Sequence, residues 1–147
     1  MAAASAPGKP KRRWRRWLAV AALLAVYPAF VLVAVYSRFF AADLPGGRNG
    51  PADAYRHSLA SAVVAYTTSP RLVDLVTQVM ERGGEGNRGR AMDAHNNRIG
   101  AQIGAAAADW PAMNAAVLQA VREGAIDASE PDRITWLPPS DWQDRLY

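Results

Sequence analysis

Two short segments of the chain concentrate polar residues of the kinds that bind ligands or transfer protons. The first is the string DAYRH at residues 53–57, the second is MDAHNNRIG at residues 92–100, and together they hold both histidines of the chain. Asp53 and His57 are four residues apart, so on a helix the carboxylate can accept a hydrogen bond from the imidazole and raise its basicity. This spacing suits a general base.

The other polar residues of these segments fit a network between helices. Asp93 and Asn97 are one helical turn apart, and Asn96 lies beside the apolar stripe of its helix, where a buried amide needs partners. We expect Arg56 to reach Asp93 or Glu81 across a helix interface as a paired ion. The predicted catalytic residues are His57, Asp53, Arg56 and Asn96, and the predicted binding or network residues are Glu81, Asp93, Asn97 and His95.

The two strings, with ER at residues 81–82 between them, resemble the signature of a bacterial family described as a domain of unknown function, over roughly residues 49–104. The resemblance implies a single folded unit whose activity is not settled, and copies of that domain occur in larger secreted and toxin-like proteins. Many members have a Trp after the RH pair and a His before the Glu, where this chain has Ala60 and Met80. The change at Met80 argues against a metal site.

Whether the chain is an enzyme stays open at this point. The main interpretation is that the chain is a structural or binding module of unknown activity, in which the polar residues form a satisfied network that holds three alanine-rich helices in register. The alternative is a membrane-tethered hydrolase of an envelope component such as lipid or peptidoglycan: His57 oriented by Asp53 activates water, and Arg56 with Asn96 or Asn97 stabilises negative charge. No serine elbow or HExxH motif supports a named class of hydrolase.

A zinc site is the third interpretation. It would use His57, His95, Asp53 and Asp93, but on one helix His95 points about 160° away from Asp93. We therefore predict no metal and no cofactor.

Four short helices must position these residues, over residues 51–66, 70–83, 90–108 and 111–123, and the absence of strand alternation predicts an all-α fold. Gly100 and Gly104, four residues apart in the third of these helices, allow another helix backbone to come close. Residues 124–147 are rich in Pro, Asp and aromatic residues. We expect an irregular tail that packs on the domain through Ile134, Trp136 and Leu137, or else stays flexible and binds a partner.

Ahead of this domain, residues 51–123, lies an uncharged run of twenty residues from Leu18 to Ser37. As a helix it would be about 30 Å long, the thickness of the hydrocarbon core of a bilayer. We predict a transmembrane helix at residues 17–40, a basic arm at residues 1–16, and a linker at residues 41–50 that lifts the domain off the membrane. A cleaved signal peptide stays the alternative, although the run is longer than a signal core and no small-x-small cleavage site follows it.

The distribution of charge predicts location and excludes several classes of protein. Residues 1–16 hold six basic residues and no acid, which leaves 11 basic against 13 acidic residues in the rest of the chain. We therefore predict no nucleic-acid binding and a cytoplasmic N-terminus in the bacterial inner (plasma) membrane, with the domain periplasmic or extracellular. The chain has no cysteine, which excludes disulfides, thiolate zinc sites and a cysteine nucleophile. The expected partners are the lipid bilayer and an envelope protein or envelope substrate.

Overall fold

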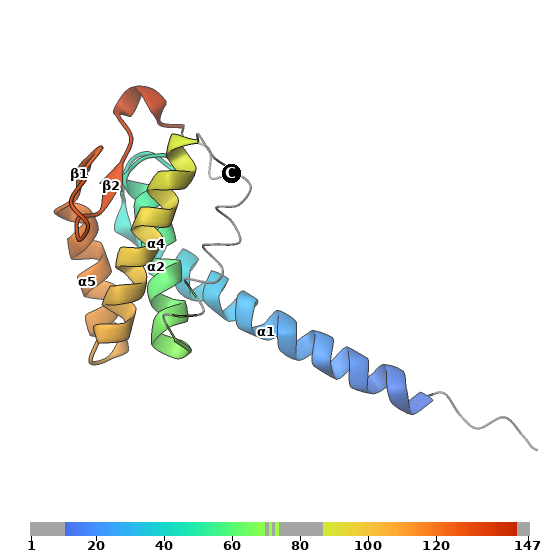
Figure 1. Ribbon diagram of the computed structural model, residues 1–147. Helices are drawn as coiled ribbons and strands as arrows, with labels where there is room; N and C mark the ends of the chain where they lie inside the picture. Colours follow the sequence, from blue (N-terminus) through green and yellow to red (C-terminus); the bar gives the residue numbers. More distant parts are fainter. Residues whose placement is uncertain (1–10, 70, 72, 74–86, 144–147) are drawn as a thin grey trace, which may run out of the picture. The chain divides into compact units, whose positions relative to one another are not determined.

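The structure is a computed structural model, and it describes residues 11–69, 71, 73 and 87–143. Four helices carry most of its regular structure: α1 (Lys11–Ala42), α2 (Pro51–Thr67), α4 (Arg88–Ala106) and α5 (Trp110–Arg122) (Figure 1). Two strands of two residues each, β1 (Ala125–Ile126) and β2 (Thr135–Trp136), and the short 3-10 helix η1 (Pro139–Asp141) follow. The prediction of an all-α fold is confirmed. The helix predicted over residues 70–83 falls largely outside the described residues.

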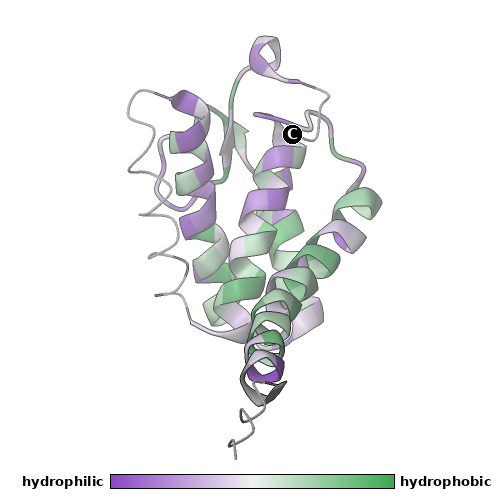
Figure 2. Ribbon diagram, turned by 90° about the vertical axis from the view of Figure 1, so that its right-hand side faces the viewer, coloured by the Kyte–Doolittle hydropathy of each residue, from purple (hydrophilic) through white to green (hydrophobic). Residues whose placement is uncertain are grey.

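The chain divides into two units between Phe30 and Val31, within α1. The stretch Trp14–Ala42 has a mean hydropathy of 2.6 over its most apolar window and is long and apolar enough to cross a bilayer. Its first half exposes large apolar side chains, and Trp17 and Leu24 are 72% and 70% exposed. In Figure 2 the green of apolar residues runs along this helix. Length and composition thus agree with the predicted membrane-spanning helix.

The end of α1, from Val31 onward, belongs to the second unit. Val35 is 3% exposed and shares a core with Leu59 of α2, Met113 of α5 and Ile134 of the tail. The segment 41–50, predicted as a spacer between membrane and domain, therefore joins two helices of the same core. The difference has a simple cause, since an apolar helix surface can be covered by protein as well as by lipid.

α2 and α4 lie side by side with their backbones in close approach. A Cβ atom added at Gly100 would lie 2.1 Å from the carbonyl oxygen of Ser58, and one at Gly104 would lie 2.2 Å from the carbonyl oxygen of Ala62. The predicted close approach at these two glycines is confirmed. Because no side chain separates the helices there, the first turns of α2 and α4 are brought within reach of each other.

The described part of the tail packs on these helices. β1 and β2 pair in parallel, with Ala125 opposite Thr135. The sequence does not predict these strands, because two residues are too few to show an alternation. Asn96 of α4, which is fully buried, holds β2 in place: its Nδ2 donates to the Thr135 carbonyl oxygen at 2.7 Å, and its Oδ1 accepts from the Thr135 N–H at 3.0 Å.

Candidate functional site

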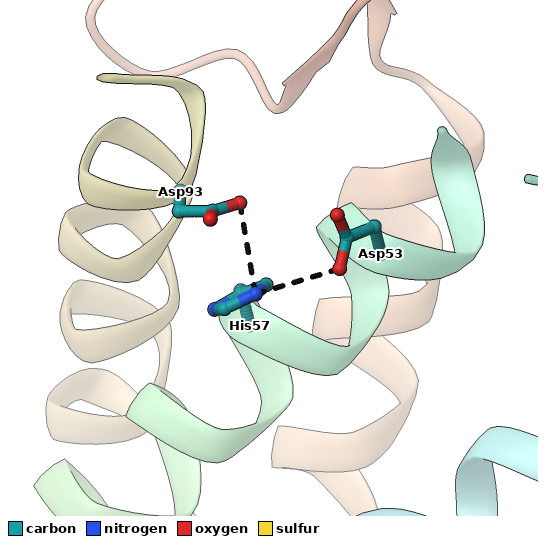
Figure 3. A group of neighbouring side chains, drawn as sticks. All are labelled: Asp53, His57 and Asp93. Carbon is teal, nitrogen blue, oxygen red and sulfur yellow. Dashed lines mark ion pairs between the residues drawn. The ribbon is translucent and has the colours of Figure 1, made fainter. Parts of the chain in front are cut away.

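Three side chains from two helices meet at one point, and we call them the Asp–His–Asp group: Asp53 and His57 of α2, and Asp93 of α4 (Figure 3). The imidazole Nε2 of His57 lies 3.4 Å from Oδ1 of Asp53 and 3.6 Å from Oδ1 of Asp93. The approach of Asp53 to His57 follows from their spacing on one helix. Asp93 joins from the neighbouring helix, so one ring nitrogen faces two carboxylates.

Asp53 is held by the start of α2. It is the third residue of that helix and is 2% exposed, and its Oδ2 accepts a hydrogen bond from the Asn49 N–H at 2.7 Å. Its Oδ1 forms an ion pair with Arg56. Burial acts to raise the pKa of Asp53, but the hydrogen bonds from His57 and Asn49 and the charges of His57 and Arg56 outweigh it and hold the pKa below its ordinary 3.8. Asp53 is therefore a fixed carboxylate.

Arg56 forms an ion pair with Asp53 on its own helix, and its predicted pairing with Asp93 or Glu81 stays a prediction. A spacing of three residues already puts the two side chains on neighbouring positions of one helical face. Glu81 lies outside the described residues.

Asp93 has the opposite electrostatic character. Its side chain is 29% exposed, yet its Oδ1 is buried and has no hydrogen-bond partner among the described residues. Burial, opposed by the charge of His57 and reinforced by that of Asp53, raises the pKa of Asp93 to about 6. The group thus combines a well-anchored carboxylate with one whose buried Oδ1 accepts no hydrogen bond from the described part of the chain.

The Asp–His–Asp group lies in an open cleft of about 1160 Å³, which we call the site cleft. Its walls are the starts of α2 and α4 and the chain after β2, and His57 is 26% exposed within it. Four arginines and three aspartates contribute to a mostly polar lining. The lining residues are Arg48, Asn49, Asp53, Arg56, His57, Asn87, Arg88, Gly89, Arg90, Asp93, Leu137, Ser140, Asp141, Trp142 and Gln143.

The tail is fastened to the cleft by bonds to Asn49 and Arg88. The Leu137 N–H donates to the Asn49 carbonyl oxygen at 2.9 Å, and Nδ2 of Asn49 donates to the Asp141 carbonyl oxygen at 3.0 Å. Arg88 pairs with Asp127 at 3.0 Å and with Asp141 at 3.5 Å. Sequence reasoning missed these cleft residues, because no local spacing connects residues that lie about ninety positions apart.

Three residues predicted for the site lie elsewhere. Asn96 is buried against β2, and neither it nor Asn97 lines the site cleft. Oδ1 of Asn97 accepts from the Ser61 hydroxyl at 2.9 Å, and the ring Nε2 of His95 is 2.8 Å from the Arg133 carbonyl oxygen, to which it donates. Of the predicted site residues, the structure brings four together: Asp53, Arg56, His57 and Asp93.

The fold and the cleft define a small helical domain with an acidic and imidazole-containing site, joined to a helix long enough to span a membrane. The model of a family described as "Domain of unknown function (DUF6973)" matches residues 19–126. Since this match covers well over half of the chain, the chain belongs to that family. The search of curated proteins gave no match, and neither did the search of solved structures. The matched region contains α2, α4 and α5 and hence the whole Asp–His–Asp group.

Proposed function

We propose that this chain is a membrane-tethered bacterial hydrolase of the cell envelope, facing away from the cytoplasm, with the Asp–His–Asp group as its water-activating centre. The observation that carries the proposal is the position of that group in an open cleft. A purely structural network would have its polar atoms paired, whereas Oδ1 of Asp93 is buried and accepts no hydrogen bond from any residue that the structure describes, beside a partly exposed imidazole. Perturbed ionisable groups in a cleft are typical of active sites.

Hydrolysis at this group needs little beyond the residues that line the cleft. A water molecule loses a proton to the group, its oxygen attacks the electrophilic centre of the substrate, and the bond to the leaving group breaks as that group takes up a proton from solvent. Asp53 fixes the orientation of the imidazole, and its own position is fixed by Asn49. Because Asn96 is buried against β2, it has no part in this chemistry.

The arginines of the cleft favour an anionic substrate. Arg48 and Arg90 are both exposed cleft residues, and guanidinium groups bind phosphate or carboxylate oxygens through paired N–H donors. In the envelope, phosphate is carried by lipid headgroups and carboxylate by peptidoglycan. The shared chemistry is an anionic group next to a hydrolysable bond.

The test uses the full chain in detergent micelles, incubated separately with vesicles of anionic phospholipid and with purified peptidoglycan. We expect release of a product from one of the two, measured by mass spectrometry. His57→Ala should lower that rate by about 100-fold or more, and Gln102→Ala, at an exposed position of α4 away from the cleft, should leave it unchanged. Absence of product from both substrates, or an equal rate in His57→Ala, would overturn the proposal.

The orientation rests on the six basic residues of segment 1–16, against Arg38 and Arg48 shortly after the apolar run. Lys and Arg are retained on the cytoplasmic side of a membrane. An alkaline phosphatase fused to the C-terminus should therefore be active, and a fluorescent protein that matures only in the cytoplasm should be dark. The reverse pair of results would contradict the orientation while leaving the site untouched.

A further inference from the structure

The contacts that join the Asp–His–Asp group are longer than strong hydrogen bonds. The two N···O separations, 3.4 and 3.6 Å, exceed the 2.7–3.2 Å range in which N–H···O bonds are strong. A single N–H can also point at only one of the two carboxylates. Asp93 Oδ1 has no hydrogen-bond partner among the described residues despite being buried. Oδ1 of Asp53 is already paired with Arg56, and a cation between the three side chains would give Asp93 Oδ1 a partner as well.

A metal ion has the dimensions for this position. Zinc binds imidazole nitrogen and carboxylate oxygen at roughly 2.0–2.2 Å, so in tetrahedral geometry neighbouring ligand atoms are roughly 3.3–3.6 Å apart. The N···O separations agree with that edge length. One ligand atom from each of Asp53, His57 and Asp93 lies within 4.8 Å of the others. The three atoms are thus close enough together for one ion to contact all of them.

We propose that Asp53, His57 and Asp93 hold a divalent metal ion, with zinc as the best fit, and that its remaining position opens into the site cleft. Imidazole and carboxylate ligands suit Zn²⁺ and Mn²⁺, and three protein ligands with one open position are typical of catalytic zinc sites. The inference deepens the proposed function and rests on it for the chemistry, whereas binding of the ion is measured separately. The ion would polarise the water that the proposed hydrolysis consumes.

Residues around the Asp–His–Asp group hold one of its proposed ligands, Asp53, in place. Asp53 is oriented by the Asn49 N–H and by Arg56, and such outer partners fix the direction of metal ligands. Two carboxylates balance the charge of a divalent ion, while Arg56 reduces the net negative charge of the site. The site should therefore bind metal more weakly than the same ligands would without that arginine.

This site differs from the zinc site considered from the sequence. That site needed His95, whose ring is instead bonded to the Arg133 carbonyl oxygen. The site proposed from the structure has three ligands from α2 and α4 instead of four, and the fourth coordination position of the ion would face the site cleft. The objection to the earlier site was that His95 and Asp93 point away from each other on one helix. It does not apply here, because His95 is not a ligand and Asp93 approaches His57 from the other helix.

The test is titration of the untagged full chain with zinc chloride, in detergent micelles, after treatment with a chelator and dialysis. Calorimetry should give one ion per chain. Asp93→Asn keeps the shape of the side chain but removes its charge, and His57→Ala removes the nitrogen; each should weaken binding at least 30-fold. His95→Ala is the matched control, since it deletes the other histidine and should bind zinc like the wild type. Circular dichroism establishes that each variant is folded.

Three outcomes would overturn the inference: no stoichiometric binding by the wild type, equal affinity in Asp93→Asn and His57→Ala, or loss of binding in His95→Ala. Replacement of zinc by cobalt(II) adds a spectroscopic readout, since a tetrahedral cobalt site absorbs strongly in the visible range and the band should vanish in Asp93→Asn. Zinc binding without hydrolysis would contradict only the proposed function. Hydrolysis at an undiminished rate by the metal-free chain would contradict only the metal site.

Discussion

Gly100→Ala adds only one methyl group, and we expect it to destabilise the fold strongly. In an exposed helix, Gly→Ala stabilises by about 1 kcal/mol through helix propensity. At Gly100 the new Cβ would lie 2.1 Å from the Ser58 carbonyl oxygen, about 1 Å or more inside an ordinary contact. That oxygen belongs to the α2 backbone and cannot move aside alone, so α4 must shift away from α2 along their whole interface.

We expect Gly100→Ala to lower the free energy of unfolding by about 3 kcal/mol, since overpacking a tight core typically costs 1–3 kcal/mol or more. For a domain of this size that is a fall of about 10 °C in the melting temperature. Displacement of α4 also carries Asp93 away from His57, now 3.6 Å away, so zinc affinity and hydrolysis should fall even in the folded fraction.

The assay is thermal unfolding of the full chain in detergent, followed by circular dichroism, with Gln102→Ala on the exposed face of α4 as the control. The control should change the unfolding free energy by less than about 0.5 kcal/mol. If Gly100→Ala were as stable as the wild type, or more stable as propensity alone requires, the described contact between α2 and α4 would be refuted.

Three further predictions concern stability. Asn96→Ala should lower the free energy of unfolding by about 2–3 kcal/mol, because it leaves two backbone groups of Thr135 buried and unpaired. Asn97→Ala should lower it by less than about 1 kcal/mol. Equal losses in a denaturant titration would refute the structural role of Asn96. Burial raises the pKa of Asp93 from 3.8 to about 6, so the metal-free folded chain loses stability as the pH rises from about 4 to about 6. Asp93→Asn should therefore raise the free energy of unfolding by about 2 kcal/mol at pH 8 and leave it unchanged at pH 3.5. A gain that does not depend on pH would contradict the raised pKa as its cause. Finally, a chain that begins at Val31 should unfold cooperatively. A chain that begins at Asp43 lacks Val35 of the core, so its free energy of unfolding should be lower by at least about 3 kcal/mol. Equal stability of the two chains would show that the end of α1 is dispensable.

The parts of the site that lie on one helix could be predicted from the sequence. Asp53 and His57 meet because residues four apart share a helical face, and the closeness of two helices at Gly100 follows from the missing side chain. That Asp93 completes the group could not be predicted, because its distance from His57 depends on the register between α2 and α4. That register is set by packing over the whole interface.

Long-range contacts account for the other differences. The end of α1 has the same apolar composition whether lipid or protein covers it, so the place of Val35 in the core gives no sequence signal. His95 and Asn96 stand in one polar string with Asp93, yet they turn toward the tail because the backbone of Arg133 and Thr135 offers them partners. The arginines and aspartates of the cleft become neighbours only after the tail has packed.

The central claim is that His57 serves the cleft and not the stability of the fold. Its most direct test is the melting temperature of metal-free His57→Ala beside that of the wild type and of Asn96→Ala. Because His57 is 26% exposed and makes no short hydrogen bond to either aspartate, we predict a change of no more than about 3 °C, against a much larger fall for Asn96→Ala. A fall in His57→Ala as large as that in Asn96→Ala would show that the Asp–His–Asp group holds the helices together, and would contradict its assignment as an active site.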